Sequence, residues 1–296
     1  MRALKFEVGG SFEGYRIGFL TLSLITSRSN SLVRRLRALA SREGRERYSL
    51  LLLEGTNLLN EALLSSCFPI EIVATTARLK EHLPLLQSLP KEIRITEVTN
   101  SVLEAALTTK SPDGVAALFP LNALPKPSKQ SHFVLALDRL QDPGNLGTLF
   151  RTALAADVEV VWLALGADPL SQKVLRASAG AVLHLPYERF GSSESIAVSK
   201  LVQKLELAAL GGHQIVGTFL PGSLSGAVVP YWEIDWTKPT VLVLGNEGSG
   251  LHSMIKTCCT HCVTLPHSSS VESLNVASAA VPLLLERRRA KMSIEI

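Results

Sequence analysis

Apolar runs without polar alternation mark the buried strands of this chain. The clearest is residues 241–244, which come directly before Gly245. Such a run is typical of a parallel strand covered on both faces. A strand of this kind ends where an α/β protein usually binds its ligand. The turn Gly245–Gly250, with three glycines and the carboxylate of Glu247, is therefore a candidate binding site.

Apolar segments with strand and helix patterns alternate along the second half of the chain. The predicted strands are 133–137, 158–165, 182–185, 214–220, 241–244 and 263–265, and the predicted helices are 147–156, 172–179, 194–210 and 273–290. Alternation of this kind predicts a mostly parallel sheet with helices on both faces. Pro282 is expected to kink the last helix.

The first half predicts a smaller α/β domain. Its predicted strands are 49–53, 70–74, 93–98 and 115–118, and its predicted helices include 55–64, 77–87 and 102–107. A proline-containing linker is expected to follow, and the first residues show no clear period. The predicted division is an extension at 1–21, an α/β domain at 22–119, a linker at 120–131 and a second domain at 132–296.

Residues 28–47 combine an apolar and a basic face. Leu32, Val33, Leu36 and Leu39 fall at helical spacing. The same stretch holds seven arginines against two glutamates. We interpret it as one helix with a phosphate-contacting surface, and the alternative is a solvated charged face. The candidate contact residues are Arg28, Arg34, Arg35 and Arg37.

Composition indicates a globular protein and permits a polyanionic partner. The 296 residues are 46% hydrophobic and 19% charged, with a net charge of +4. Four cysteines are too few for a disulfide framework, so a reducing cytoplasm is expected. Cys258, Cys259 and Cys262 match no zinc spacing, and no metal site is predicted. The apolar run 17–25 is too short to span a membrane, and none is expected elsewhere.

Several nucleotide and hydrolase motifs are missing. No lysine follows Gly250, so the turn is not a phosphate-cradling loop of the NTPase type. A dinucleotide-binding G-x-G-x-x-G and a G-x-S-x-G nucleophile elbow are also lacking. On its own, the glycine turn can equally be a helix-capping turn, so other segments have to decide.

Three motifs in order carry a family resemblance. Residues 142–153 read D-P-x-N-x-G-x-x-x-R-T-A, residues 244–251 read L-G-N-E-G-x-G-L, and Leu265-Pro266 is followed by V-E-S-L-N-V at 271–276. This arrangement resembles the SpoU/TrmH class of SPOUT RNA ribose 2′-O-methyltransferases. Residues 25–62 and 109–115 are similar to the N-terminal substrate-binding domain of that class.

The resemblance implies an enzyme that transfers a methyl group from S-adenosylmethionine to RNA. It implies a C-terminal trefoil knot, a homodimer, and ribosomal or transfer RNA as substrate. No metal is needed for this reaction. Two alternatives remain: a non-catalytic RNA-binding protein that kept the fold, and a nucleotide-dependent α/β enzyme of another kind.

Site residues carry over position by position. The implied catalytic residues are Arg151, Asn145, Glu247, Ser273 and Asn275. The implied cofactor-binding residues are Gly245, Leu265, Leu274, Thr218 and Asn246. Arg151 is expected to clamp the target phosphate and stabilise alkoxide charge, because a guanidinium is a poor base. Glu247 is expected to orient Arg151 or a neighbouring amide, and Asn145, Ser273 and Asn275 can instead be helix caps. The chain departs from the family pattern at His267, Ser269 and Ala277.

Overall fold

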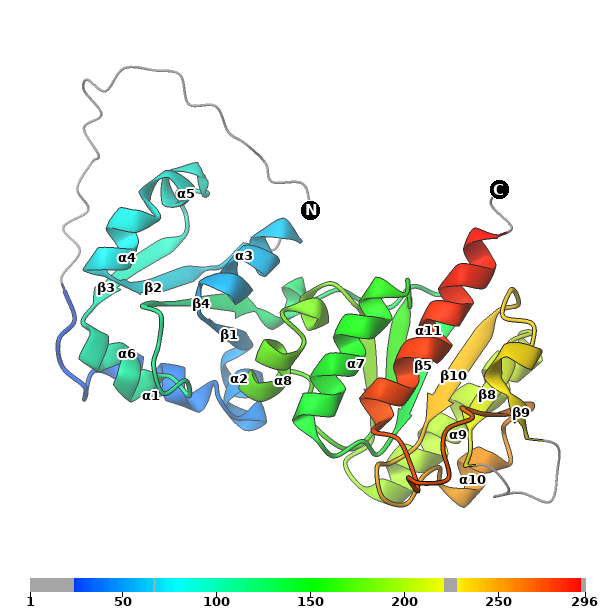
Figure 1. The fold of residues 1–296 in the computed structure, drawn as a ribbon. Helices are drawn as coiled ribbons and strands as arrows, with labels where there is room; N and C mark the ends of the chain where they lie inside the picture. The colour runs from blue at the N-terminus through cyan, green and yellow to red at the C-terminus, as the bar shows by residue number, and fades with distance from the viewer. Residues whose placement is uncertain (1–23, 66–67, 221–227, 294–296) are drawn as a thin grey trace.

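The computed structural model describes residues 24–65, 68–220 and 228–293. These residues form two β-sheets, each covered by helices, that lie side by side along the molecule (Figure 1). The predicted extension at 1–21 lies outside the described residues.

The first sheet belongs to a small α/β domain. Its strand order is β1-β4-β2-β3. Its strands are β1 (Leu50–Glu54), β2 (Glu71–Thr75), β3 (Arg94–Val98) and β4 (Val115–Pro120). Its helices are α1 (Ser31–Ala38), α2 (Arg42–Tyr48), α3 (Thr56–Leu64), α4 (Thr76–Glu81), α5 (Leu83–Ser88) and α6 (Asn100–Ala106). β4 runs antiparallel to both β1 and β2, whereas β2 and β3 are parallel.

The second sheet has seven strands in the order β7-β6-β5-β10-β8-β11-β9, and every pairing in it is parallel. Its strands are β5 (Phe133–Asp138), β6 (Val160–Ala164), β7 (Tyr187–Phe190), β8 (Gln214–Thr218), β9 (Val229–Pro230), β10 (Thr240–Leu244) and β11 (His261–Thr264). Its helices are α7 (Pro143–Ala155), α8 (Gln172–Ala177), α9 (Glu194–Leu210), α10 (Ser253–Lys256) and α11 (Val276–Met292). Short 3₁₀ turns lie at Ala181–Leu183 and Tyr231–Glu233, and another, Leu121–Ala123, lies between the two sheets in the chain. The predicted α/β fold with a mostly parallel sheet is confirmed.

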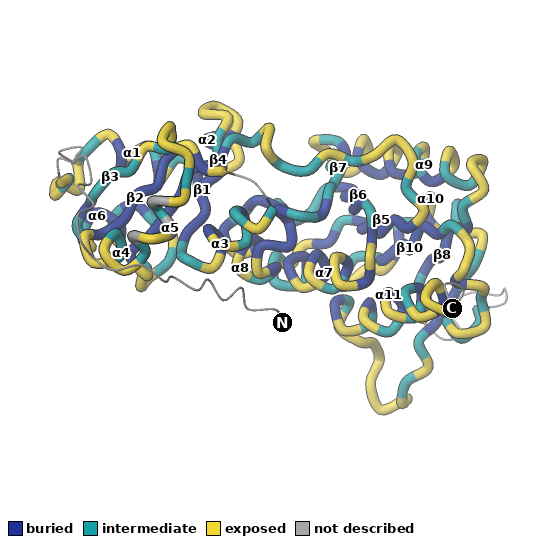
Figure 2. The backbone as a smooth tube through the Cα atoms, turned by 90° about the horizontal axis from the view of Figure 1, so that it is seen from above, coloured by how far each residue is buried: buried dark blue, intermediate teal, exposed yellow. Residues whose placement is uncertain are grey.

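Continuous apolar strands are needed because helices cover both faces of this sheet. In β10, Leu242 and Leu244 pack into the core beneath α7 and α11, while Val241 and Val243 pack into the core beneath α9. Side chains of a strand point alternately to opposite faces, so both sets must be apolar. The central strands are accordingly buried along their length (Figure 2).

The predicted basic helix at 28–47 is two helices, so that prediction is wrong in detail. The hydroxyl of Ser41 accepts a hydrogen bond from the N–H of Gly44 and caps α2. A side chain at position 44 would lie 1.8 Å from the carbonyl oxygen of Ala38. Glycine therefore allows the chain to turn sharply between α1 and α2. Residues 77–87 are likewise divided, because Pro84 stands in the first turn of α5.

The strand predicted at 182–185 is also wrong. These residues form part of a 3₁₀ turn, and the strand follows at β7. Gly180 has a φ of +82° and accepts a hydrogen bond from the N–H of Leu183. Val182 and Leu185 are buried in the core, and a short buried apolar run does not distinguish a strand from a helical turn.

One of the hydrophobic clusters extends across both sheets. A single cluster contains Leu51 and Leu58 of the first domain together with Phe150 and Leu175 of the second. The side chain of Gln172 donates to the carbonyl of Leu52 at 2.7 Å across the junction. Residues of the predicted linker join this core, since Leu121 and Leu124 pack against it. The linker therefore does not act as a spacer, and the exact domain boundaries stay a prediction.

A buried ion pair also joins the domains. The guanidinium of Arg45 in α2 pairs with the carboxylate of Asp168, and their side chains are 2% and 27% exposed. Arg45 also donates to the carbonyls of Leu39 and Ala40 at 3.4 and 3.2 Å. One buried side chain thus orders the turn between α1 and α2 and holds the second domain. Arg45 is one of the seven arginines counted toward the predicted basic face, but it is buried, so the prediction is wrong for this residue.

We predict that Arg45→Met lowers the free energy of unfolding by about 3 kcal/mol, toward the lower end of the range for breaking a buried pair because Asp168 keeps some solvent contact. Denaturant titration measures this change. The matched control is Arg34→Met on the exposed side of α1, which should change stability by less than about 0.5 kcal/mol. Equal effects of the two substitutions would contradict the role of Arg45.

Candidate active site

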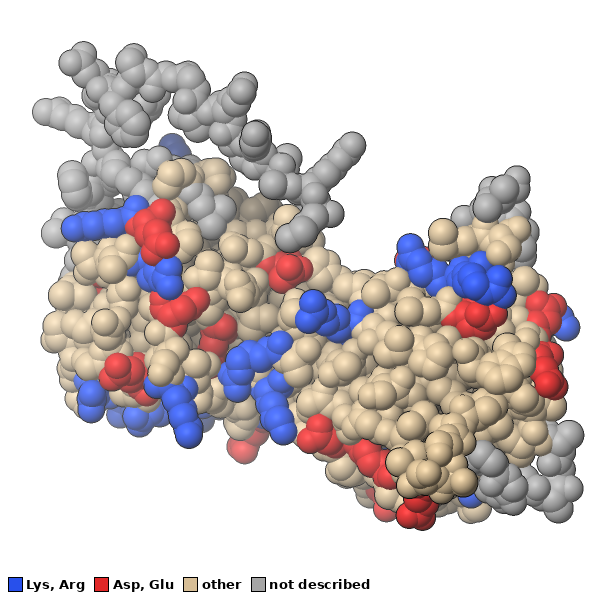
Figure 3. All heavy atoms as spheres, viewed as in Figure 1, with Lys and Arg blue, Asp and Glu red and all other residues tan. Residues whose placement is uncertain are grey.

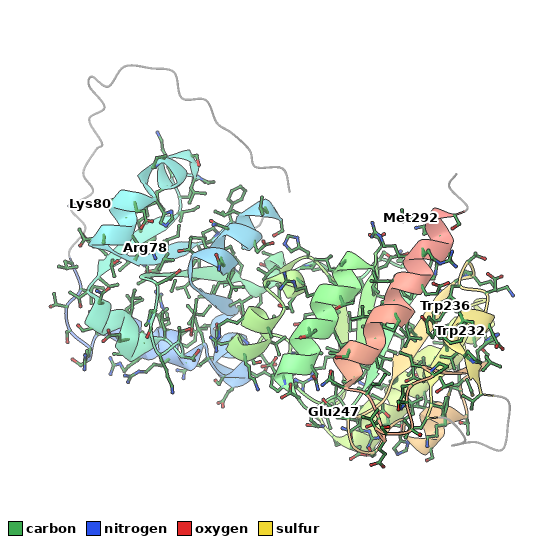
Figure 4. The ribbon with its side chains drawn as sticks, in the orientation of Figure 1. Arg78, Lys80, Trp232, Trp236, Glu247 and Met292 are labelled. Atoms are coloured by element: carbon green, nitrogen blue, oxygen red, sulfur yellow. The ribbon has the colours of Figure 1, made fainter. Side chains whose placement is uncertain are left out.

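A cavity of about 480 Å³ lies at the carboxyl ends of the central parallel strands. Its walls come from residues 218–220 after β8, 244–251 after β10, 264–267 after β11, Asn145 of α7, Lys256 of α10, and the segment leading into α11. Figure 4 places Glu247 at this end of the sheet. Strand order reverses between β5 and β10, which is where open α/β sheets bind their ligands.

Gly245 follows β10 at the wall of the cavity. A Cβ atom there would lie 2.4 Å from the carbonyl carbon of Gly250 and 2.5 Å from the nitrogen of Leu251. Real Cβ atoms do not approach so closely, so only glycine allows this turn to fold back on its strand. The glycine at this position is therefore required by the close approach of two backbone segments.

Asn246 fixes the turn to the neighbouring strand. Its side-chain amide donates to the carbonyl of Arg139, just beyond β5, at 2.9 Å. Its Oδ1 accepts from the N–H groups of Gly248 and Ser249, both at 3.0 Å. The side chain therefore links the ends of β5 and β10 and shapes the cavity wall from within.

Glu247 joins the turn to the start of α7. Its carboxylate accepts from the backbone N–H groups of Gln141 and Asp142 at 3.2 and 3.0 Å, and from the amide of Asn145 at 3.3 Å. Burial acts to raise the pKa of Glu247, but these hydrogen bonds outweigh it and the pKa is lowered. Glu247 is thus an ionised acceptor at neutral pH.

Asn145 and Asn275 extend this network across the cavity. The amide of Asn275 donates to Oδ1 of Asn145 at 2.9 Å, and the amide of Asn145 in turn donates to Glu247. Oδ1 of Asn275 also accepts from the N–H groups of Ala277 and Ser278 and caps α11. Both side-chain amides are therefore held in one orientation.

Most predicted site residues meet in this cavity. The predicted cofactor-binding residues that line it are Gly245, Leu265, Leu274, Thr218 and Asn246, and the predicted catalytic residues that line it are Asn145, Glu247, Ser273 and Asn275. Their assigned roles stay predictions. As for the alternative capping roles, Asn275 is a cap, whereas Asp142 rather than Asn145 caps α7. Ser273 caps no helix, because α11 begins at Val276 and not at 273 as predicted.

Arg151 lies away from the cavity of its own chain. It is exposed on α7, is not among the cavity-lining residues, and forms no hydrogen bond or ion pair with any residue that the structure describes. It follows Asn145 by six residues, which is about 9 Å along the helix and on a different face. Glu247 therefore contacts the amide of Asn145 and not Arg151 within one chain.

The predicted RNA-binding arginines are in different environments. Arg34 is exposed and has no partner among the described residues. Arg28 lies 3.9 Å from Glu104, and Arg37 donates to the carbonyl of Ala105. Arg35 pairs with the buried carboxylate of Glu71, so it contributes to the packing of α1 on the sheet. Their contact with RNA stays a prediction.

Sequence patterns missed Lys256 and His267, which also line the cavity. Lys256 stands on α10, a four-residue helix too short to show a period. The sequence marks His267 as a departure from the family pattern and assigns it no role. Its Nδ1 lies 2.7 Å from the carbonyl of Leu265.

The cysteine cluster shows no metal-binding arrangement. Cys258, Cys259 and Cys262 are free thiols, and burial raises the pKa of each, that of Cys259 to about 12. No group of three or more His, Cys, Asp or Glu side chains in the described parts of the chain is placed to hold a metal ion. Over the same ranges, no helix has the length and apolar content needed to cross a membrane.

Both domains of the chain match known protein families. Residues 132–284 match the SpoU rRNA Methylase family, and residues 30–117 match the MRM3-like substrate binding domain. An uncharacterized tRNA/rRNA methyltransferase of Synechocystis is 38% identical over 278 residues, covering 90% of this chain and 94% of that protein. The 23S rRNA (guanosine(2553)-2′-O)-methyltransferase RlmP of Bacillus subtilis is 31% identical, covering 89% and 98%.

The fold is shared with solved structures. The AdoMet-bound rRNA methyltransferase from Sinorhizobium meliloti superposes with a TM-score of 0.74 at 28% identity, covering 90% of this chain and 97% of that one. The sequence match at 132–284 includes all three motifs and every residue that lines the cavity. The chain therefore belongs to the SpoU rRNA methylase family.

Proposed function

We propose that this protein transfers a methyl group from S-adenosylmethionine to a ribose 2′-hydroxyl of RNA. The observation that carries the proposal is the hydrogen-bonded series Asn275, Asn145 and Glu247 at the wall of a cavity formed by the family's motifs. Ribosomal RNA is the preferred substrate, because the named relative from Bacillus subtilis acts on 23S rRNA. Transfer RNA is the second choice.

The charge and the lining residues of the cavity support the binding of this cofactor. A hydrogen bond from the N–H of Asn145 lowers the pKa of Asp142, and the pKa of Glu247 is also lowered, so two ionised carboxylates stand beside the cavity. When bound, S-adenosylmethionine supplies a methyl group on a positively charged sulfonium, which such carboxylates favour. Gly245, Leu265 and Leu274 would hold its adenosine portion against backbone and apolar surface.

The polar residues of the chain act by positioning and by stabilising charge. Asn145 and Asn275 are each held by a partner, so they present fixed donors and acceptors to an incoming ribose. Preorganised groups of this kind need no rearrangement during the reaction. Ser273 lines the same cavity and is exposed, so its hydroxyl is available to the substrate.

Arg151 acts from a second copy of the chain in this proposal. It lies outside its own cavity but close in sequence to Leu154, which is 36% exposed on α7. Val281, Leu285 and Met292 of α11 are exposed as well, and α7 packs beside α11 (Figure 1). Exposed apolar side chains on adjacent helices favour a homodimer through this face. The dimer would bring Arg151 to the partner's cavity, where it clamps a phosphate and stabilises alkoxide charge.

The remaining features implied by the family belong to the same proposal. The turn after β10 and the segment between β11 and α11 line one cavity, which is consistent with a chain that closes in a trefoil knot before α11. We also propose domain boundaries after residues 21, 119 and 131, and a cytoplasmic location.

Methylation assays test the activity directly. Purified protein should incorporate methyl groups from S-adenosylmethionine into rRNA transcripts, and nucleoside mapping should find the product as a 2′-O-methylated ribose. A protein that binds RNA but transfers no methyl group to rRNA or tRNA would instead be the non-catalytic alternative.

Arg151→Ala should lower turnover by about a hundredfold or more while leaving cofactor affinity nearly unchanged, because a charge-stabilising donor is removed. Arg151→Lys should restore little, since an ammonium does not replace a planar guanidinium. Mixing Arg151→Ala with Asn145→Ala protein should recover activity, because a mixed dimer contains one complete site. Absence of recovery in mixtures shown to exchange subunits would contradict the contribution of Arg151 from a second chain.

Leu285→Asp should convert the dimer into monomers and abolish most activity, because a carboxylate would be buried at the subunit contact. Light scattering measures the mass. The control is Leu210→Asp, an exposed leucine at the end of α9 on the other face of the sheet, which should leave the dimer intact. A wild-type protein that is monomeric at micromolar concentration would refute this prediction.

A further inference from the structure

Basic side chains gather where the two domains meet, over helix α8 (Figure 3). Lys173 and Arg176 are three residues apart on α8 and therefore on one face of that helix. Their side chains are 63% and 44% exposed. Helix α8 packs against α7, which carries Asn145 of the proposed active site. The two cations thus lie between the small domain and the cavity.

Arg176 connects this surface to the small domain. Its Nη1 donates to the hydroxyls of Thr108 and Thr109, both at 3.3 Å, and lies 3.4 Å from the carboxylate of Glu54. The neighbouring Lys110 is exposed and has no hydrogen bond or ion pair within the described ranges. Because its neighbour Thr109 is held by Arg176, Lys110 is kept close to α8.

Lys173 connects the surface to the active site. Its Nζ lies 3.6 Å from the carboxylate of Asp142, whose backbone N–H donates to Glu247. The pair is exposed, and exposed pairs contribute little to stability. Lys173 can therefore leave Asp142 and pair with a phosphate of the RNA at little cost in free energy.

The charges near the cavity explain why such a surface is needed. Glu247, Glu272 and one cation, Lys256, line the cavity and Asp142 adjoins it, so the net charge at its edge is negative and unfavourable for a polyanion. To be methylated, an RNA strand must nevertheless place one ribose in the cavity. Cations beside the cavity offset this repulsion, and Lys173 and Arg176 lie between it and the arginines of α1.

We propose that Lys110, Arg176 and Lys173 bind the phosphate backbone of the substrate RNA where it passes from the small domain to the cavity. The proposal rests on the proposed function and adds a second contact surface to the arginines of α1. Because the contacts are to phosphates, they position the RNA without reading its sequence. The surface also requires both domains, since Lys110 belongs to one and Lys173 to the other.

The test uses the full-length double variant Lys110→Gln and Lys173→Gln. Arg176 is left intact, because it neutralises the buried Glu54. Binding of an rRNA substrate is measured as a function of salt. The slope of log affinity against log salt should decrease by about 0.7 to 0.9 for each phosphate that the variant no longer neutralises. The KM for RNA should rise severalfold, while the Kd for S-adenosylmethionine stays the same.

The matched control is Lys200→Gln, an exposed lysine on α9 that has no partner among described residues and lies on the opposite face of the sheet. It should leave the slope and the KM unchanged. An unchanged slope and KM in the double variant would overturn the proposal. Failure of the proposed function would give a different result, because the wild-type protein would then methylate no RNA. The salt slope would still be measurable, since RNA binding requires no turnover.

Discussion

The arrangement of the site depends on one carboxylate. Glu247 follows β10, but its hydrogen bonds go to the turn after β5 and to Asn145 of α7. It therefore joins two strands at the point where the strand order of the sheet reverses. Asn145 then orients Asn275, which caps α11. One ionised group thus begins a hydrogen-bonded series that connects all three motifs, and its lowered pKa keeps it charged near neutral pH.

A second constraint is the packing of the two domains against each other. Arg45 is buried between the turn that follows α1 and Asp168 of the methyltransferase domain. The shared core and the hydrogen bond from Gln172 to the carbonyl of Leu52 act at the same junction. The small domain is consequently held at a fixed position beside α8. A surface composed of residues from both domains, such as Lys110 with Lys173, keeps its geometry only because of this packing.

Charge is distributed unevenly in a way that matches the two proposed ligands. Carboxylates outnumber the single lysine, Lys256, at the cavity, where a cationic cofactor would bind, and further exposed cations stand outside it, where a polyanion would lie. Arg151 is also an exposed cation outside the cavity of its own chain, but on α7. Its position on an exposed face of α7, close to exposed apolar residues, is the reason for proposing that the complete site forms only in a dimer.

The sequence alone determined the elements whose signals are local. Continuous apolar runs identified β5 and β10, helical spacing identified α9 with its full bounds, and the three motifs identified cavity residues such as Asn145, Gly245 and Asn275. Only the tertiary structure decided the rest. Arg45 looked like any surface arginine until α2 was placed against Asp168, and the strand expected at 182–185 is a turn because Gly180 redirects the chain. Lys256 reaches the cavity from a helix of four residues. Contacts of this kind join residues that are distant in sequence, and periodicity carries no information about them.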